Sequence, residues 1–299
     1  MIRYKKLGYI ALNVSDVERS RAWYRSMVGL EPNGYGPAGE AFMRADRDHH
    51  SLVLYQGAKP GLKRIGWQLE DDRQLDVVAR VLDQHGLRWR SLGAEECAAI
   101  GMTHTIRLAE PVTGITLDFY GSGMTQMPEP VTSPVCDLDF LCHIGIGTPR
   151  YREAIKFYEE VLNFKTSDEI DGRINLMRAF PNPMHHSFAI ANADRDKLHH
   201  YNFMVRSVAD IDRGRERFRA GGVPIVWDGH HPPSGNTFLF FLDRDGLSVE
   251  YGVGMEMFPE VGARPHRVFP ARPESFDSKG AVPERRMAAA GDIEVVEEI

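Results

Sequence analysis

The chain has 299 residues, of which 42% are hydrophobic and 26% are charged, and its 36 basic and 42 acidic residues give a net charge of −6. This composition is typical of a soluble globular protein and excludes a disordered chain or a collagen-like scaffold. The mild acidity gives no electrostatic reason to expect a nucleic-acid partner, and no apolar run is long enough to span a membrane.

At roughly 150 residues per domain, this length predicts two domains. The three cysteines are Cys97, Cys136 and Cys142, and no two of them form a Cys-x-x-Cys pair. Such a low, odd number argues against a disulfide framework and against a structural zinc site. The N-terminal segment lacks the long apolar stretch and small-residue cleavage site of a signal peptide. We therefore expect the protein in a reducing cytoplasm.

The chain repeats itself, and the repeat defines its elements. Residues 8–31 and 142–165 both show a short alternating strand, an amphipathic helix and a return into a strand. Corresponding residues of the two copies are 134 positions apart, and Tyr24 of the first copy is matched by Tyr158 of the second. The chain therefore consists of two similar halves.

The parallel continues downstream, where a strand beginning near Gly66 corresponds to one beginning near His200. Each of these strands is followed by a helical pattern and then by a closing strand. The predicted helix and closing strand cover residues 73–86 and 114–121 in the first half and residues 208–222 and 246–252 in the second half.

These patterns predict an α+β protein of two tandem domains, each made of two β-α-β-β-β units that form an open mixed-sheet barrel. The segment between the halves is rich in Gly, Ser and Pro and reads as a linker. We expect an N-terminal domain over residues 1–133 and a C-terminal domain over residues 134–265. The proline-broken tail, residues 266–299, is expected to wrap the surface or to be mobile.

Three corresponding strand positions differ in chemistry between the halves. The first half has Tyr9, Gly66 and Asp118 where the second half has His143, His200 and Glu250. Two imidazoles and one carboxylate on one face form the 2-His-1-carboxylate arrangement, which typically holds non-haem Fe(II) and leaves positions open for other ligands. Taken singly, each histidine is more often a hydrogen-bonded core residue. However, a buried carboxylate at Glu250 without a partner would be costly, and a metal ion removes that cost.

The segments LCHIGIG, KLHHYNFMV and LSVEYG, in this order and spacing, resemble those of the type I extradiol catechol dioxygenases of the vicinal oxygen chelate (glyoxalase-like) superfamily. The resemblance extends to about residue 265 and is greatest to the two-domain enzymes that cleave 2,3-dihydroxybiphenyl. It implies that the C-terminal domain is catalytic and that the N-terminal domain is a metal-free duplicate. By this resemblance His143, His200 and Glu250 bind Fe(II), with Mn(II) as the alternative, and His200 is selected over His199.

The resemblance assigns catalytic roles to two further histidines. His186 would be the acid-base residue, because an ordinary histidine pKa near 6.5 lets the ring take and return a proton at neutral pH. His231 would contact a substrate oxygen or bound dioxygen. The alternative for His185-His186 is a polar start of a strand, as His49-His50 would be in the first half.

Two features depart from the family pattern. Pro232-Pro233-Ser234 follows His231 where the family typically has Thr-Asn-Asp, and Phe240 stands where it usually has a tyrosine that hydrogen-bonds the substrate. A phenyl ring cannot donate, so either another group donates or the substrate preference or rate is altered. The expected substrate contacts, in a mostly apolar pocket, are His231, Phe240, Tyr251, Met177 and Phe188.

The sequence thus predicts an Fe(II)-dependent extradiol dioxygenase that cleaves an aryl-substituted catechol with O2 in aromatic-compound degradation. The expected partners are a small aromatic diol and O2, without nucleic acid or membrane, and the resemblance implies a homo-oligomer. Two alternatives stay open: a non-oxidative metal-dependent lyase or isomerase of the same superfamily, and a protein that only binds small aromatic molecules.

Overall fold

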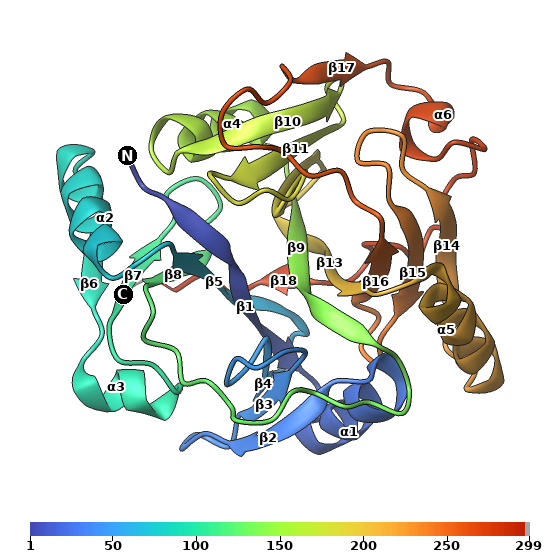
Figure 1. Cartoon of the computed structure of the whole chain (residues 1–299), viewed down its shortest axis with the longest axis horizontal. Helices are drawn as coiled ribbons and strands as arrows, with labels where there is room; N and C mark the ends of the chain where they lie inside the picture. The colour runs from blue at the N-terminus through green and yellow to red at the C-terminus, as the bar shows by residue number, and fades with distance from the viewer. Residues whose placement is uncertain (297–299) are drawn as a thin grey trace.

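The computed structural model describes residues 1–296 and contains two mixed sheets, one in each half of the chain (Figure 1). The first half contains β1 (Tyr4–Val14), α1 (Val17–Trp23), the π-helix η1 (Tyr24–Val28), β2 (Glu31–Tyr35), β3 (Ala41–Arg44), β4 (Leu52–Gln56), β5 (Gly61–Leu69), α2 (Arg73–Gln84), β6 (Trp89–Ser91), α3 (Ala94–Ala99), β7 (Thr105–Ala109) and β8 (Thr116–Tyr120).

The second half contains β9 (Leu138–Thr148), α4 (Tyr151–Glu160), β10 (Phe164–Ile170), β11 (Ile174–Ala179), β12 (Phe188–Asn192), β13 (Lys197–Val205), α5 (Val208–Ala220), β14 (Ile225–His230), β15 (Thr237–Leu242) and β16 (Ser248–Val253). The segment that follows contains β17 (Arg267–Phe269), α6 (Pro273–Phe276) and β18 (Asp292–Ile293). The predicted β-α-β-β-β units are therefore all present. The exact domain boundaries stay a prediction.

The strand order explains how each half becomes a mixed sheet. The orders are β2-β3-β4-β1-β5-β8-β7-β6 and β14-β15-β16-β13-β9-β12-β11-β10-β17. The first strands of the two units pair antiparallel, β1 with β5 and β9 with β13. The last strand of each unit returns parallel to its first strand, as β4 does to β1 and β16 to β13. A parallel return needs a long crossover, which the helix and the intervening strands provide.

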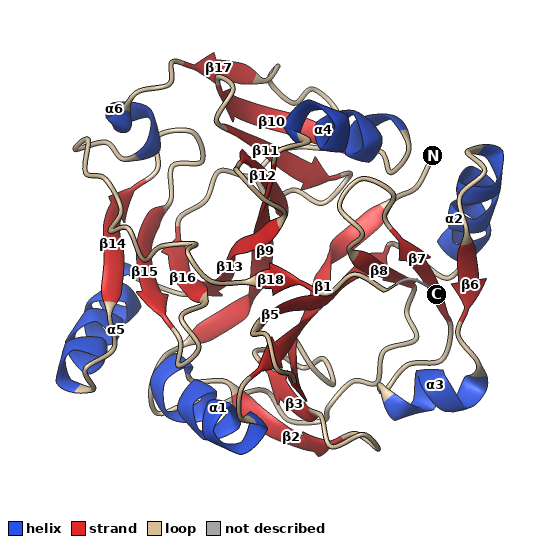
Figure 2. Cartoon of the chain, turned by 180° about the vertical axis from the view of Figure 1, so that it is seen from behind, coloured by secondary structure: helices blue, strands red, loops and turns tan. Residues whose placement is uncertain are grey.

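The helices cover the outside of the sheets, and Figure 2 shows them around the periphery of the molecule with the strands inside. Helix α4 illustrates the cause, because Ala154, Ile155 and Tyr158 lie on its buried face as the amphipathic pattern predicts. Aromatic residues join the two halves into one core. The ring of Trp67 contacts the ring of Phe164 in the second half, with 5.0 Å between their centroids.

The tail is ordered over its described part and contacts both halves (Figure 1). Strand β17 pairs parallel with β10 in the second half, and β18 pairs parallel with β5 in the first half. Of the two expectations for the tail, the structure therefore supports wrapping; residues 297–299 lie outside the described residues. Over residues 1–296, no helix combines the length and apolar character needed to cross a membrane.

Candidate metal centre and cavity

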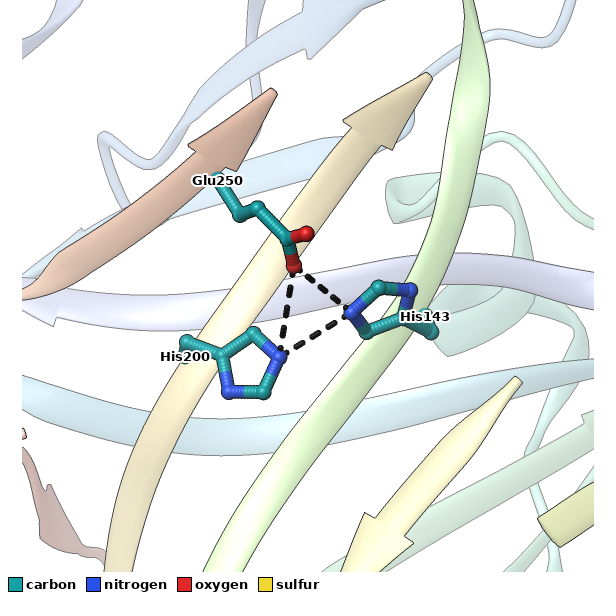
Figure 3. Close-up of side chains that lie close together, drawn as sticks. All are labelled: His143, His200 and Glu250. Carbon is teal, nitrogen blue, oxygen red and sulfur yellow. Dashed lines mark hydrogen bonds and ion pairs between the residues drawn. The ribbon is translucent and has the colours of Figure 1, made fainter. Parts of the chain in front are cut away.

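Three neighbouring strands bring His143, His200 and Glu250 together (Figure 3). The register pairs Asn202 of β13 with both His143 of β9 and Glu250 of β16. His200 lies two residues before Asn202, so its side chain is on the same face of β13. Room for the imidazole comes from Gly145, where an added Cβ would lie only 2.7 Å from the His200 ring.

The three groups point their electron-pair donor atoms at one another. The His143 Nε2 atom lies 3.0 Å from His200 Nε2 and 2.9 Å from Glu250 Oε2, and His200 Nε2 lies 3.5 Å from Glu250 Oε2. All three side chains are buried, and burial lowers the pKa of His200 well below its ordinary value. Neutral imidazoles and a carboxylate are the forms that bind metal ions.

An unsatisfied carboxylate atom supports a metal ion as the missing partner. Glu250 is 1% exposed, and no donor in residues 1–296 forms a hydrogen bond with its Oε2 atom. Its Oε1 atom accepts a hydrogen bond of 3.2 Å from the amide of Asn236. A buried carboxylate with an oxygen that lacks a hydrogen-bond donor is costly, and a divalent cation would satisfy this carboxylate together with the two imidazoles. The residues therefore fit such an ion.

The centre opens on a cavity of about 470 Å³. His186, His199, His231 and Phe240 line it together with the three candidate ligands. The rest of its wall is mainly apolar and comes from β10, β11, β14 and the tail, with Ile170, Ile174, Leu176, Trp227, Phe276 and Met287 among the lining residues. A cavity of this size with few polar groups suits a small aromatic molecule.

His186 lies against the centre, with its ring centroid 4.2 Å from that of His143. Burial, followed by the neighbouring His143, lowers the pKa of His186 well below its ordinary value. Its Nδ1 atom is 3.0 Å from Nδ1 of His185, so its Nε2 atom is the one left for a molecule in the cavity. His199 lines the cavity and lies behind His200, with 2.7 Å between their Nδ1 atoms.

His231 is held by the tail. Its Nδ1 atom donates a hydrogen bond of 2.6 Å to the backbone carbonyl of Phe276, and its ring stacks on Phe238 with centroids 3.9 Å apart. Burial lowers the pKa of His231, which favours the neutral ring. With Nδ1 engaged as a donor, Nε2 is left as a hydrogen-bond acceptor.

Of the other expected substrate contacts, the structure brings only Phe240 to the cavity. Tyr251 follows Glu250 on β16 and therefore points to the opposite face, where its hydroxyl donates to the Val28 carbonyl at 2.7 Å. Met177 and Phe188 pair with each other across β11 and β12 and are buried in the main core. The expectation for Tyr251, Met177 and Phe188 is therefore corrected: they support the sheet from behind.

The strand register also corrects the correspondence between the halves. Tyr9 pairs with Gly66, and Gly66 pairs with Asp118. Gly66 therefore occupies the place of Asn202, two residues beyond His200, and the counterpart of His200 is Arg64. The Arg64 Nε atom lies 3.2 Å from Asp118, and Arg107 Nε lies 2.7 Å from it. Guanidinium groups thus neutralise the carboxylate of the first half.

Two contacts that hold Glu250 and His231 are not predicted from the sequence. Asn236 holds Glu250, and the Phe276 carbonyl holds His231. Asn236 lies five residues after His231 in the altered loop. An asparagine at this place could have indicated a hydrogen-bond partner for the carboxylate. No sequence pattern indicates a backbone carbonyl in a tail as a partner of His231.

The chain is similar in sequence to known proteins. Residues 6–107 and 141–251 match the Glyoxalase/Bleomycin resistance protein/Dioxygenase superfamily. The chain is 28% identical over 261 residues to biphenyl-2,3-diol 1,2-dioxygenase of Paraburkholderia xenovorans, covering 83% of this chain and 87% of that protein. It is 24% identical over 262 residues to manganese-dependent 2,3-dihydroxybiphenyl 1,2-dioxygenase of Geobacillus genomosp. 3, covering 80% of this chain and 81% of that protein.

A solved structure shares the fold. It is a variant of homoprotocatechuate 2,3-dioxygenase from Brevibacterium fuscum, with a TM-score of 0.88 and 20% sequence identity. The match covers 100% of this chain and 85% of that chain.

Proposed function

The chain belongs to the Glyoxalase/Bleomycin resistance protein/Dioxygenase superfamily, and we propose that it is an extradiol dioxygenase that opens the ring of an aryl-substituted catechol with O2. The observation that carries this proposal is the convergence of His143, His200 and Glu250 beside an aromatic-sized, mostly apolar cavity. The relatives with biphenyl-2,3-diol 1,2-dioxygenase activity in their names support the substrate class.

The metal would be held by His143, His200 and Glu250, whose donor atoms all lie within 4.8 Å of one another. We propose Fe(II), and the manganese-dependent relative makes Mn(II) the alternative. When bound, the metal supplies a Lewis acid and a path for electrons from the diol to O2. With three protein ligands, such an ion would keep coordination positions open for other molecules.

The residues around the cavity would position the diol and move its protons. Nε2 of His186 would take a proton from a diol hydroxyl and return it as the ring opens, because Nδ1 of the same ring is engaged with His185. Nε2 of His231 would accept a hydrogen bond from the substrate. The rings of Phe240 and Trp227, whose centroids are 5.6 Å apart, would pack on the aryl group and exclude water.

Oxygen uptake tests the proposal. Protein loaded anaerobically with Fe(II) is given 2,3-dihydroxybiphenyl and, separately, catechol, while O2 and the visible spectrum are followed. We expect one O2 consumed per diol, a yellow ring-opened product and a preference for the aryl-substituted diol. Absence of uptake by metal-loaded protein with either diol contradicts the proposal and favours a non-oxidative reaction.

Two variants make this test specific. His143→Ala removes a candidate ligand, so we expect loss of both bound metal and O2 uptake. His104→Ala is a matched control, because His104 is an exposed histidine of the first half. It should retain metal and full uptake. Loading with Mn(II) in place of Fe(II) then decides which ion supports turnover. Light scattering of the same samples tests the predicted homo-oligomer.

A further inference from the structure

A buried ionic cluster lies behind His186, on the side away from the cavity. Its centre is Asp168 of β10, whose side chain is 0% exposed. The carboxylate accepts a hydrogen bond of 2.8 Å from His185 Nε2. It also accepts two bonds of 2.9 Å from the guanidinium of Arg264, which lies in the segment after β16. Arg267 of the same segment donates three more, of 2.6 and 3.1 Å from its guanidinium and of 2.8 Å from its backbone amide.

These contacts fix which atoms carry protons. Although burial alone would raise it, the hydrogen bonds from His185, Arg267 and Arg264 hold the pKa of Asp168 well below its ordinary value. The carboxylate can then only accept, so the proton of the bond to His185 is on His185 Nε2. Burial lowers the pKa of His185, which keeps this ring neutral and leaves its Nδ1 atom as an acceptor.

The chain of hydrogen bonds continues to His186. The Nδ1 atoms of His185 and His186 are 3.0 Å apart, so the proton between them is on His186 Nδ1. Proton exchange between His186 and a molecule in the cavity is therefore left to Nε2. An imidazole with the opposite tautomer would present an N–H to the cavity and could not accept a proton there.

We propose that Asp168 and His185 are positioning residues that hold His186 in the tautomer and orientation required to accept a proton at Nε2. The assignment of proton transfer to His186 rests on the proposed function, whereas the hydrogen-bond chain itself does not. Since Arg264 and Arg267 complete the cluster, the segment after β16 takes part in this positioning.

The first half of the molecule supplies an internal comparison. His49 and His50 repeat the histidine pair, with the same 3.0 Å between their Nδ1 atoms. Within the described part of the chain, however, no carboxylate forms a hydrogen bond with His49. The carboxylate anchor is thus found in the half that carries the candidate metal ligands, although the histidine pair is common to both halves.

Substitutions at position 185 test the chain of hydrogen bonds from Asp168 to His186. His185→Phe keeps a ring and removes the acceptor, so we expect kcat for the diol to fall on the order of tenfold or more with little change in KM. His185→Asn restores an acceptor oxygen near the Nδ1 position and should recover most of the turnover. His49→Phe is the matched control in the first half and should leave kcat unchanged. A His185→Phe variant with normal kcat overturns the proposal.

A spectroscopic measurement separates this inference from the proposed function. The full chain is labelled with ¹⁵N-histidine and loaded with diamagnetic Zn(II), and the His186 signals are assigned by their loss in His186→Gln. We expect a protonated Nδ1 and an unprotonated Nε2 in the unmodified chain, and loss of this tautomer preference in His185→Phe. A proton on Nε2 overturns the proposal, even if His185→Phe fails to fold. If no diol is oxidised, the proposed function fails while this measurement still tests the tautomer.

Discussion

The guanidinium of Arg64 lies 3.2 Å from the carboxylate of Asp118, at the two places that His200 and Glu250 occupy in the second half of the molecule. The hydroxyl of Tyr9 completes the group with a hydrogen bond of 2.5 Å to the same carboxylate. A fixed positive side chain thus stands in the first half where the second half presents a neutral imidazole. The first half neutralises its buried carboxylate with guanidinium groups, whereas the second half leaves Glu250 facing two imidazoles, and these three groups form a candidate donor set for a metal ion.

Replacing Arg64 by Met should therefore destabilise the fold without altering metal binding. Arg64 is 6% exposed and Asp118 is 0% exposed, and removing one partner of a buried ion pair typically costs about 3–5 kcal/mol. Because Arg107 also contacts Asp118, we expect about 2–3 kcal/mol in urea unfolding. The exposed Arg73→Met is the control and should not shift the curve. Metal analysis should give the same stoichiometry for both variants.

Glu250→Gln should affect the metal-free and metal-loaded forms in opposite directions. Without metal, the buried Glu250 carboxylate has an oxygen without a hydrogen-bond donor in the described structure, so a neutral amide should raise Tm. With metal, the loss of a charged ligand should lower both Tm and affinity. Thermal unfolding with and without chelator measures both effects. A variant that melts higher in both conditions would contradict the assignment of Glu250 as a ligand.

Phe240→Tyr should add a hydrogen-bond donor beside the centre. The ring centroid of Phe240 is 5.1 Å from that of His200, and Phe240 lines the cavity. One neutral hydrogen bond contributes about 1 kcal/mol, which corresponds to a roughly fivefold rise in catechol turnover. Steady-state kinetics measure this change, and an unchanged rate would mean that another group already donates to the substrate.

Phe241→Tyr is the control for that variant. Phe241 is the next residue on β15, and its side chain points to the opposite face, into the main core. A hydroxyl there has no access to the cavity. This variant should lose stability without gaining turnover.

Asp277→Ala should weaken substrate binding from a distance. The Asp277 carboxylate is buried and accepts backbone hydrogen bonds of 2.9 Å from His230 and 3.0 Å from both Lys279 and Ala281. Loss of these bonds should loosen the cavity wall formed by Phe276, raise KM and speed proteolysis after α6. Glu274→Ala, an exposed change in the neighbouring helix α6, should leave KM unchanged. Equal KM values for the two variants would show that the wall does not depend on Asp277.

Asp243 should make stability depend on pH. Burial raises the pKa of this carboxyl to about 6 from its ordinary 3.8, although the hydroxyl of Tyr24 donates to it at 2.6 Å. A raised carboxyl pKa gives stability that is complete below pH 3.8 and is lost as pH rises to about 6.

Asp243→Asn removes this titration. The free energy of unfolding of the variant, relative to that of the unmodified chain, should therefore increase by up to about 3 kcal/mol as the pH rises from 4 to 7. Urea unfolding at several pH values measures the difference. A constant difference across this range would show that Asp243 has an ordinary pKa in the folded chain.

The sequence by itself determined the repeat and the element types, and it singled out His143, His200 and Glu250 as candidate metal ligands. Those inferences depend on side-chain periodicity and residue type, which are local properties of the chain. Strand alternation also directs Tyr251 to the face opposite Glu250, so the expected substrate contact of Tyr251 conflicts with the periodicity of its own strand.

Only the tertiary structure decided which residues meet. Strand register depends on backbone hydrogen bonds and bulges between β1, β5 and β8, and it assigned Arg64, not Gly66, to the place of His200. The approach of the tail to His231, and of Asp168 to His185, joins residues far apart in the chain. No periodicity encodes such contacts, because they form only when separate elements pack against one another.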